Sequence, residues 1–431
     1  MVNFGAIKPF TALVIGDFML DTYTTGRVKR ISPEAPVPVM EVVKQESRPG
    51  GAGNVVLNLT TLGAKVISVG RIGNDAAGDE LKKQFGDSLV LETGYRTPVK
   101  NRFVSDSQQL MRVDFETVSS LPKELEAKVI DSLKQIIPTV QVVAISDYGK
   151  GFLTGAILAA AIRMAKEAKV PLIVDPKGID FTKYRGAYLI KPNLSEAYAA
   201  AKLPTTASLD EVASVLLQIT SAELLLITRS EAGISLFDGT RTDFPVRSKE
   251  VKDVTGAGDT VLATLCLAVA NGLDIAVAVQ LANIAAGISI ERIGCVQVTL
   301  SEMAKRLLEF NLSSKIFDEN HTYALHQVLK DRRYTLLVLN PGQEMSNALF
   351  KTIRQLSKER ELIIYTQENE LIDILTSINE VHFIIQQRES LKHLCETIHP
   401  HEIYILEKDR LHSRDLLSML LHANVIAKKD L

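Results

Sequence analysis

Five short apolar runs alternate with helix-like segments along the first half of the chain, and this alternation limits the fold more than any other feature. The runs are TALVIGD (11–17), QVVAISD (141–147), PLIVDPK (171–177), AYLIKPN (187–193) and LLLITRS (224–230). Continuous apolar strands separated by helices indicate a parallel sheet that is covered on both faces. We therefore predict an α/β fold with a central parallel sheet.

Each of these runs ends in polar residues, namely Asp17, Asp147, Asp175 with Lys177, Asn193, and Thr228 with Ser230. A single Asp or Asn at such a position is commonly a helix N-cap. Open α/β sheets bind ligands outside the carboxyl ends of their strands. Five polar strand ends together therefore favour one shared cleft.

Two segments interrupt the alternation. Residues 23–48 and 95–115 are punctuated by Pro or rich in β-forming residues, which predicts a small antiparallel sheet projecting from the main domain. Such a flap would close over a substrate or pair with a second subunit. Between the two segments, glycines at 50, 51 and 53 precede a helix that we expect to begin at Asn54; they allow close approach to a ligand, although ordinary tight turns look the same.

The stretch VKDVTGAGDT (251–260) is followed by VLATLCLAVA, which is apolar nearly all round and is stopped by Asn271 and Gly272. This pattern predicts a buried helix whose N-terminus lies in the glycine loop. The loop matches neither G-x-x-x-x-G-K-[ST] nor G-x-G-x-x-G.

Three consecutive amides in this loop, those of Gly256, Ala257 and Gly258, would form an anion site with the helix dipole. Asp259 beside that site suits a base that takes a proton from a substrate hydroxyl while the amides stabilise a transferring phosphoryl group. The structural alternative is a helix cap preceded by a tight turn.

Other features exclude several classes of function. All eight histidines lie between His321 and His422, so we expect no imidazole chemistry in the first three quarters of the chain. The cysteines Cys266, Cys295 and Cys395 lie in apolar contexts without C-x-x-C spacing, which predicts buried thiols. A net charge of −2 with interleaved signs argues against nucleic acid and favours a small-molecule partner. Short apolar runs and no signal-like N-terminus predict a cytoplasmic protein without a membrane partner.

The sequence resembles the ribokinase-like (PfkB-type) sugar kinases. DVTGAGDT is similar to their C-terminal signature, and RPGGAGNVVLNLTTLGAKVISVGRIGNDAAGDEL is similar to their N-terminal glycine signature. GDFMLDTYTTGRVKRISPEAPVPV, SDSQQLMRVDFE, SDYGKG, DPKGIDFTKYRGAYLIKPNLSEA and LLITRSEAGISLF narrow the resemblance to the kinase domain of the bifunctional heptose 7-phosphate kinase and heptose 1-phosphate adenylyltransferases. The resemblance covers about residues 8–312 and implies a ribokinase-like three-layer α/β/α sheet with a small β flap.

The resemblance also implies roles for matching residues. Asp259 would be the catalytic base, with the anion hole formed by Gly256, Ala257 and Gly258. The sugar hydroxyls would be bound by Asp17, Gly51 and Asn54. The substrate's own phosphate would be held by Arg112 and, with less support, by Lys100 and Arg102, although an exposed flap arginine is often only solvated. The nucleotide side would be lined by Lys177, Ser230, Gly233 and Asn283. Magnesium and the phosphates would be organised, often through water, by Asn193 and Glu196; Glu196 could instead only favour the helix dipole.

The implied reaction converts ATP and D-glycero-β-D-manno-heptose 7-phosphate into the 1,7-bisphosphate and ADP, in ADP-heptose synthesis for the lipopolysaccharide core. Flap-mediated homodimers are common in this family. Whether a monovalent cation assists near Asp253 and Thr255 is left open. Two alternatives are a ribokinase-like kinase for another sugar or sugar phosphate, and a non-catalytic regulatory or scaffold protein with this fold.

The last part of the chain departs from the resemblance. We predict a kinase domain over 1–312, a linker over 313–333, and a smaller Rossmann-like α/β domain over 334–431 with strands YTLLVLN, ELIIYTQ, VHFIIQQ and EIYIL. Its position matches the family's adenylyltransferase, which depends on H-x-G-H after the first strand. Here NPGQEMSNALFKTI follows that strand, and H-x-G-H and a Ser/Thr-rich signature are both missing. We treat His399 and His401 as surface or structural residues, and expect a degenerate domain with a structural or dimer-supporting role.

Overall fold

The computed structural model describes residues 4 and 7–414, except for 106–107, 247–250, 312–314, 318–324, 327–328, 330–331, 341, 359, 367–368, 387–390 and 408–409. The chain divides into two compact units. The larger is Lys8–Thr299, and the smaller is Leu300–Leu431 with Met1–Ile7. The division therefore falls before the boundary predicted at residue 312.

The larger unit is built on an eight-stranded sheet with the order β14-β13-β12-β11-β10-β9-β1-β4. Its strands are β1 (Phe10–Gly16), β4 (Ala64–Val69), β9 (Val142–Ser146), β10 (Leu172–Asp175), β11 (Leu189–Ile190), β12 (Leu224–Thr228), β13 (Ile234–Phe237) and β14 (Arg241–Phe244). The pairings from β4 to β12 are all parallel, and β13 and β14 add an antiparallel edge. The predicted parallel sheet is confirmed.

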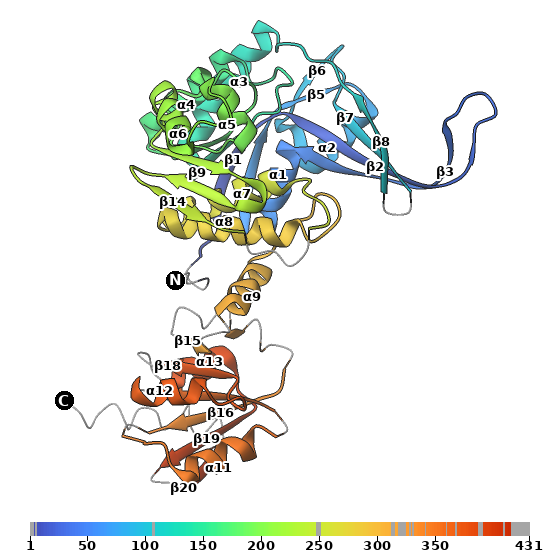
Figure 1. The fold of residues 1–431 in the computed structure, drawn as a ribbon. Coiled ribbons are helices and arrows are strands. Elements are labelled where there is room, and N and C mark those ends of the chain that lie inside the picture. Colours follow the sequence, from blue (N-terminus) through green and yellow to red (C-terminus); the bar gives the residue numbers. More distant parts are fainter. Residues whose placement is uncertain are drawn as a thin grey trace. The chain divides into compact units, whose positions relative to one another are not determined.

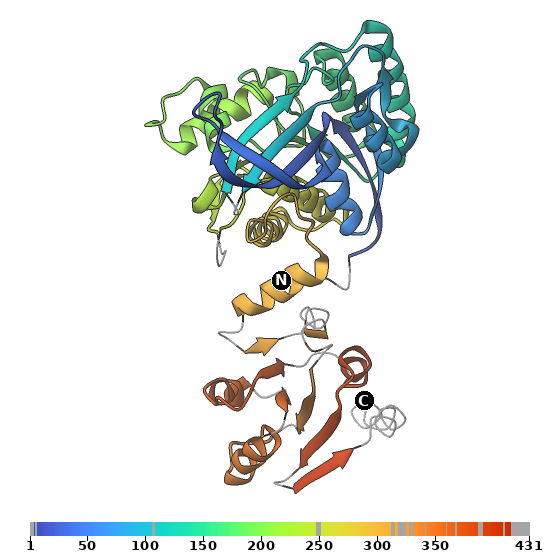
Figure 2. The ribbon, with the colours of Figure 1, turned by 90° about the vertical axis from the view of Figure 1, so that its right-hand side faces the viewer.

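Helices cover both faces of this sheet (Figures 1 and 2). One face carries α3 (Lys123–Ile136), α4 (Gly155–Ala168), α5 (Leu194–Ala201) and α6 (Leu209–Thr220), and the other carries α1 (Ala52–Thr61), α7 (Ala257–Ala270) and α8 (Ile275–Ser289). The short α2 (Ala76–Phe85) lies near β5 (Arg71–Gly73) and β6 (Val90–Glu92), which form a two-stranded sheet. Apolar side chains of α3 to α6 and of the strands form one buried cluster, because strand residues alternate between the two faces.

The flap is a four-stranded sheet with the order β3-β2-β7-β8. Its strands are β2 (Phe18–Ile31), β3 (Pro38–Gly51), β7 (Val99–Ser105) and β8 (Gln108–Phe115). The hairpins β2–β3 and β7–β8 are antiparallel, as predicted, but β2 and β7 pair in parallel. The prediction of a wholly antiparallel sheet is therefore wrong. The two hairpins are joined by a long connection that includes α1 and α2, which allows the second to enter in the parallel direction.

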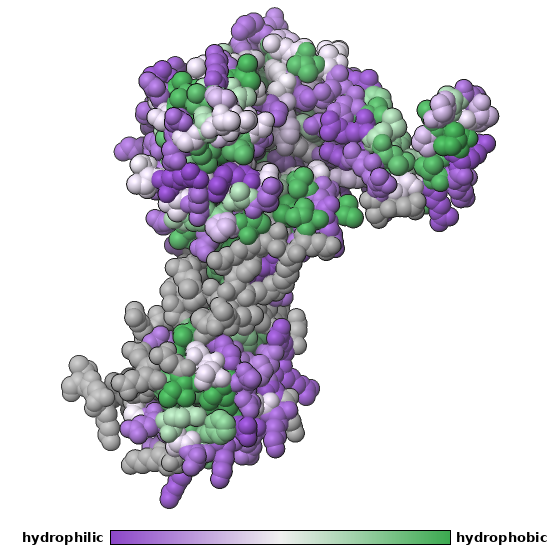
Figure 3. Space-filling model, viewed as in Figure 1, coloured by the Kyte–Doolittle hydropathy of each residue, from purple (hydrophilic) through white to green (hydrophobic). Residues whose placement is uncertain are grey.

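The projecting end of the flap exposes apolar side chains. Ile31, Val42 and Val43 are 58–66% exposed. Figure 3 shows hydrophobic surface on the extended hairpin. Ile31 pairs with Pro38 and Val42 pairs with Gly26, so these exposed apolar side chains are spread along the hairpin.

The smaller unit has a six-stranded sheet with the order β15-β18-β17-β16-β19-β20, parallel except at β20. Its strands are β15 (Ile316–Phe317), β16 (Tyr334–Leu339), β17 (Glu361–Thr366), β18 (Phe383–Gln386), β19 (Glu402–Glu407) and β20 (Arg410–Arg414). The helices assigned to it are α9 (Leu300–Asn311), α11 (Asn347–Leu356), α12 (Asn369–Thr376) and α13 (Leu391–Ile398). The four predicted strands are confirmed.

The predicted linker, 313–333, is not only a connection. Its residues 316–317 form β15, which pairs with β18 and so belongs to the second sheet. Much of the rest of this segment lies outside the described residues. Among the helices of the described ranges, none has both the length and the apolar character needed to cross a membrane.

Candidate active site

The glycine loop and the start of α7 place Asp259 inside the larger unit. Gly256 precedes the helix in the left-handed region, with φ 78°, which favours glycine. A Cβ at this position would lie 2.7 Å from Asn54 Nδ2, so a side chain is also excluded by space. Asp259 is the third residue of α7 and is only 2% exposed. The predicted buried helix that ends at Asn271 is confirmed.

The amides of this loop are not equivalent. The N–H of Ala257 donates to the carbonyl of Val254 at 3.3 Å. Within the described part of the chain, the N–H groups of Gly256, Gly258 and Asp259 have no hydrogen-bond partner. Of the three amides predicted to form an anion hole, those of Gly256 and Gly258 are therefore available among the described residues, whereas that of Ala257 is engaged. That these amides bind an anion stays a prediction.

Both oxygens of the Asp259 carboxylate accept a hydrogen bond. Asn54 Nδ2 donates to Oδ2 at 2.8 Å, and the Tyr148 hydroxyl donates to Oδ1 at 2.9 Å. Burial raises the pKa of Asp259 to about 7, with a further contribution from the negative charge of Asp175, while the two hydrogen bonds oppose the shift. A carboxyl group that titrates near neutrality is suited to general-base catalysis.

Asp17, at the end of β1, lies in the same region. Its Oδ2 accepts hydrogen bonds from the N–H groups of Tyr148 at 2.9 Å and Lys150 at 3.0 Å, and burial raises its pKa. Gly51 packs directly against it, because a Cβ there would lie 2.5 Å from the Asp17 carbonyl. Gly51 is also the N-cap of α1, which begins at Ala52; the prediction that the helix starts at Asn54 is wrong by two residues.

A buried ion pair lies beside the loop. Lys191 Nζ is 2.9 Å from Asp175 Oδ1, and the Lys191 side chain is only 3% exposed. A Cβ built on Gly258 would be 3.6 Å from both Lys191 Nζ and Asp175 Oδ2, so the pair adjoins the amide site. Burial raises the pKa of Asp175, and the positive charge of Lys191 opposes this. A fixed cation is thereby held next to the place predicted for an anion.

Asn193 and Glu196 begin α5 as a capping box. Asn193 Oδ1 accepts from the Glu196 N–H at 2.9 Å, and Glu196 Oε2 accepts from the Asn193 N–H at 3.1 Å. Lys177 Nζ is 2.7 Å from Glu196 Oε1. The helix-capping role of Glu196 is thus present, and its carboxylate also connects to the predicted nucleotide side through Lys177.

The oxygens of Asn193 and Glu196 fit a magnesium ion that keeps most of its waters. In the described ranges, no group of three or more His, Cys, Asp or Glu side chains is close enough to hold a metal ion directly. The Glu196 side chain is 15% exposed, and each of its oxygens keeps a lone pair besides its hydrogen bond. Mg²⁺ commonly keeps several waters and binds one or two carboxylates with substrate phosphates, which this arrangement accommodates.

The other residues predicted for the nucleotide side lie around the β12–β14 edge. Ser230 has φ 50°, and the Gly233 N–H donates to its carbonyl at 3.0 Å. Asn283 on α8 donates from Nδ2 to the carbonyls of Phe244 and Pro245, at 3.4 and 2.8 Å. A Cβ on Gly233 would lie 2.0 Å from the same Phe244 carbonyl. Gly233 and Asn283 therefore both face the end of β14.

The three flap cations differ in what surrounds them. Arg102 forms an ion pair with the buried Asp21, and Arg112 forms a bidentate pair with Asp114 at 2.8 and 3.0 Å. Lys100 forms no ion pair within the described residues. Its Nζ lies 5.4 Å from the centre of the Tyr148 ring, and burial lowers its pKa. Among the described residues, Lys100 is therefore the one of the three that has no ion-pair partner, and the phosphate-binding roles of all three stay predictions.

Asp147 is occupied by the protein itself. Its Oδ1 accepts from the Gly149 N–H at 2.7 Å, and its Oδ2 contacts Lys183 at 2.7 Å and accepts from the Tyr184 hydroxyl at 2.6 Å. Asp147 therefore holds the neighbouring loops together, whereas the sequence predicted that it lines the shared cleft.

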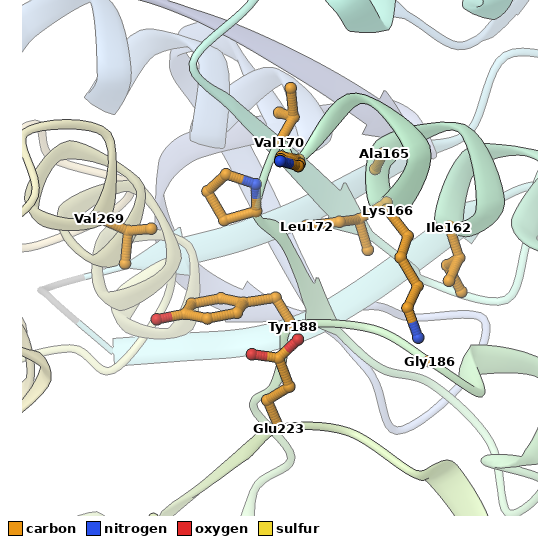
Figure 4. Close-up of a pocket in the computed structure, with 11 residues that line it drawn as sticks. Ile162, Ala165, Lys166, Val170, Leu172, Gly186, Tyr188, Glu223 and Val269 are labelled. Atoms are coloured by element: carbon orange, nitrogen blue, oxygen red, sulfur yellow. The ribbon is translucent and has the colours of Figure 1, made fainter.

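A cavity of about 460 Å³ lies at the opposite edge of the sheet (Figure 4). It is lined by Pro171, Tyr188 and Glu223, which immediately precede β10, β11 and β12. These are the amino ends of the strands, so the cavity is separate from the site around Asp259.

The model of the pfkB family carbohydrate kinases matches residues 11–302, which is more than half of the chain and includes all the side chains described around Asp259. The chain belongs to the pfkB family of carbohydrate kinases. The prediction of a sugar kinase, a phosphotransferase with an alcohol group as acceptor, is confirmed at the level of this family.

Relatives named bifunctional protein HldE support the same assignment. Identity is 44% over 301 residues in Trichlorobacter lovleyi, 46% over 310 residues in Geobacter metallireducens and 39% over 371 residues in Pelobacter propionicus. The alignments cover 68%, 70% and 83% of this chain and 61%, 63% and 76% of the relatives. The matches to the first two thus span less than two thirds of those proteins. The third extends beyond Lys8–Thr299 into the smaller unit.

Solved pfkB-like structures confirm the ribokinase-like fold. A ribokinase of Arabidopsis thaliana, solved with ribose and ATP, aligns with a TM-score of 0.54 at 18% identity and covers 70% of this chain and 99% of that one. Phosphofructokinase-2 of Escherichia coli, solved with potassium, aligns with a TM-score of 0.58 at 16% identity and covers 72% and 100%.

Two residues of this kinase site were not found from the sequence. Tyr148 and Lys191 follow strands β9 and β11, and both stand within quoted motifs, SDYGKG and KPN. Their position at the carboxyl ends of strands was the available signal. Their partners, Asp259 and Asp175, are distant along the chain, so no spacing rule connects them.

Proposed function

We propose that this chain transfers the γ-phosphoryl group of ATP to the O1 hydroxyl of D-glycero-β-D-manno-heptose 7-phosphate. The observation that carries the proposal is Asp259: a buried carboxyl with a pKa of about 7, beside the amides of Gly256 and Gly258, which have no partner in the described part of the chain. A base that titrates near neutrality and an anion site at a helix N-terminus are the two parts that phosphoryl transfer to a hydroxyl needs.

In the proposed reaction the sugar O1–H donates to Asp259. The proton moves to the carboxylate as O1 bonds to the γ-phosphorus, and the bond to ADP breaks. The amides of Gly256 and Gly258 stabilise the charge on the transferring group, and the neighbouring Lys191 adds a fixed positive charge. Asp17 and Asn54, with the backbone at Gly51, are placed to bind the sugar hydroxyls.

The nucleotide would lie toward Lys177, Ser230, Gly233 and Asn283. Asn193 and Glu196 would hold Mg²⁺ through water, and the ion would supply positive charge to the phosphates. Lys177 pairs with Glu196 at 2.7 Å and would exchange this partner for a phosphate oxygen. A monovalent cation near Asp253 and Thr255 would assist the reaction, and kinase rates measured over a series of K⁺ and Na⁺ concentrations would test this.

The choice of heptose 7-phosphate rests on the flap and on the relatives. The HldE-named relatives match the kinase region at 39–46% identity. Lys100 lies near the Tyr148 ring and has no ion-pair partner among the described residues, which favours an acceptor that already carries a phosphate. ADP-heptose synthesis for the lipopolysaccharide core, in the cytoplasm where ATP is supplied, is the corresponding role.

The smaller unit is proposed to have lost nucleotidyl transfer. The residues after β16, from Asn340, contain no histidine before α11 begins at Asn347. His399 has φ 52° and packs edge-on against His326, and His401 packs against Tyr334, which suits a structural role. We also propose a homodimer through the flap, because apolar side chains such as Val43 are exposed there.

Phosphorus NMR of the full chain with MgATP and heptose 7-phosphate tests the kinase. A new anomeric phosphate with matching ADP is expected. ADP formation with another acceptor in a sugar and sugar-phosphate panel, and none with heptose 7-phosphate, would refute the substrate while keeping the family. In a separate tube, heptose 1-phosphate with ATP should give no ADP-heptose; its formation would contradict the loss of the second activity.

The variant Asp259→Asn tests the proposed base. It should abolish phosphoryl transfer while ATP still binds, and unchanged turnover would refute the role of Asp259 as the base.

A further inference from the structure

Tyr148 contacts two carboxylates of the site with two different groups. Its backbone N–H donates to Asp17 Oδ2 at 2.9 Å, and its hydroxyl donates to Asp259 Oδ1 at 2.9 Å. Asp17 follows β1, whereas Asp259 belongs to α7 on one face of the sheet. One residue therefore connects the carboxylate assigned to the sugar with the carboxylate assigned to proton transfer.

The segment that carries Tyr148 is fixed by buried contacts. Lys150 donates its N–H to Asp17 at 3.0 Å, and its carbonyl accepts from Arg71 Nη2 at 2.7 Å. The Arg71 side chain is fully buried, bonds to Glu92 at 3.1 Å and stacks over Tyr95 at 3.7 Å. The position of the Tyr148 hydroxyl is consequently set by a rigid backbone, which is what precise placement of a catalytic group requires.

We propose that Tyr148 is the positioning residue of the base: its hydroxyl orients the Asp259 carboxylate and favours its ionised form, while its N–H holds Asp17 at a fixed distance from that base. The proposal rests on the proposed kinase function and assigns a role to a residue that the reaction scheme does not use. Tyr148 acts through Asp259 and does not itself take the proton.

The hydrogen-bonding capacity of the carboxylate agrees with this role. Each carboxylate oxygen offers two lone-pair positions, and Asn54 and Tyr148 each occupy one. A position on either oxygen remains for the substrate hydroxyl. Burial raises the pKa of the Tyr148 phenol well above its ordinary value, and the charge of Asp259 acts in the same direction. Tyr148 therefore stays protonated and donates throughout the working pH range.

Other charged or titratable groups also face the base, and none replaces Tyr148. The negative charge of Asp175 raises the pKa of Asp259, and the positive charge of Lys191 lowers it, but neither group donates a hydrogen bond to Asp259 among the described contacts. The buried Cys295 thiol adjoins Gly256. Lys100 lies over the Tyr148 ring. In the described part of the chain, the side chains that donate directly to Asp259 are those of Asn54 and Tyr148.

The test compares pH profiles of Tyr148→Phe and wild type. Removing the hydroxyl destabilises the ionised carboxylate, so the acid limb of kcat/KM should move up by about one pH unit, with about a fivefold loss at pH 7 that grows to about tenfold below pH 6 and is recovered at higher pH. Tyr184→Phe is the matched control, because it removes a phenol-to-carboxylate hydrogen bond from Asp147 and should leave the limb in place. An unmoved limb in Tyr148→Phe, or a pH-independent loss, overturns the proposal.

Two further measurements separate positioning from stability and from substrate choice. In an Asp259→Asn background, Tyr148→Phe should change the residual rate at pH 7 less than twofold; the same fivefold loss there, about that expected in the wild-type background, would show a merely structural role. Titration of the Asp259 carboxyl carbon by ¹³C NMR, assigned by its disappearance in Asp259→Asn, needs no acceptor. A raised pKa in Tyr148→Phe supports the proposal even if heptose 7-phosphate is not the substrate, and an unchanged pKa refutes it.

Discussion

Asn54 on α1 donates its Nδ2–H to Oδ2 of Asp259 on α7 at 2.8 Å, across 205 residues of sequence. The contact joins the N-terminal glycine signature to the C-terminal one. It is made possible by the left-handed Gly256, since a side chain there would collide with the Asn54 amide. The two signatures therefore meet in one place, where the second supplies the carboxylate proposed as the base and the first donates a hydrogen bond to it.

The first prediction concerns the pH dependence of turnover. Asp259 must be ionised to accept a proton, and burial raises its pKa to about 7. The value of kcat/KM should therefore fall about tenfold per pH unit below pH 7 and level off above it. A steady-state series from pH 5.5 to 9 with the best acceptor measures this. A rate that is flat between pH 6 and 8 would contradict the assignment of Asp259 as the base.

The second prediction concerns stability. The Asp259 pKa rises from its ordinary value of 3.8 to about 7 on folding, so between these values the folded chain holds a proton that the unfolded chain releases. The free energy of unfolding must then decrease as the pH rises through this window. Asp259→Asn removes the penalty and keeps both neighbours, because the Asn oxygen accepts from Asn54 and its amide donates to the Tyr148 hydroxyl.

The expected result is a gain of about 4 kcal/mol for Asp259→Asn at pH 8 and a smaller gain of about 1.5 kcal/mol at pH 5, because the folded carboxyl is protonated at the lower pH. Chemical denaturation at the two pH values measures the difference. A variant that is less stable than wild type at pH 8 would show that ionising the buried Asp259 carboxyl does not destabilise the folded chain.

The third prediction compares two glycines of the loop. Gly256→Ala places a Cβ at φ 78° and 2.7 Å from Asn54 Nδ2, and should lower the free energy of unfolding by about 2 kcal/mol while displacing the donor from the base. Gly258→Ala is the control for folding, because its Cβ meets neighbours only at 3.6 Å. Equal thermal stability of the two variants would contradict the claim that the backbone conformation and the close approach to Asn54 require a glycine at position 256.

The sequence predicts the parts of this site that local patterns encode. The apolar run after DVTGAGDT indicates α7, and its glycines indicate the amide site, because both depend on neighbouring residues. The engagement of Ala257 with Val254, the parallel pairing of β2 with β7 and the bond from Tyr148 to Asp259 are not encoded locally. These features depend on the register of the strands and on contacts between segments that are distant along the chain, and the spacing of residues in the sequence does not reveal either.

The same limit explains the flap cations. Lys100 and Arg102 stand two residues apart on β7 and look equivalent in the sequence. The register pairs Asp21 with Lys100 across β2 and β7, yet it is Arg102 whose guanidinium reaches the Asp21 carboxylate. Side-chain length and direction therefore decide which cation is neutralised, and the sequence alone does not give them.

The last prediction follows from that difference. Arg102→Met leaves the Asp21 carboxylate buried without its partner, so it should lower the free energy of unfolding by about 3 kcal/mol. Lys100→Met keeps the apolar stem and breaks no ion pair, so stability should change by less than about 1 kcal/mol, while KM for a phosphorylated acceptor rises about tenfold. Denaturation and steady-state kinetics measure the two effects. A KM that rises only in Arg102→Met would assign the acceptor phosphate to Arg102, and Lys100 would then be a surface cation packed on Tyr148.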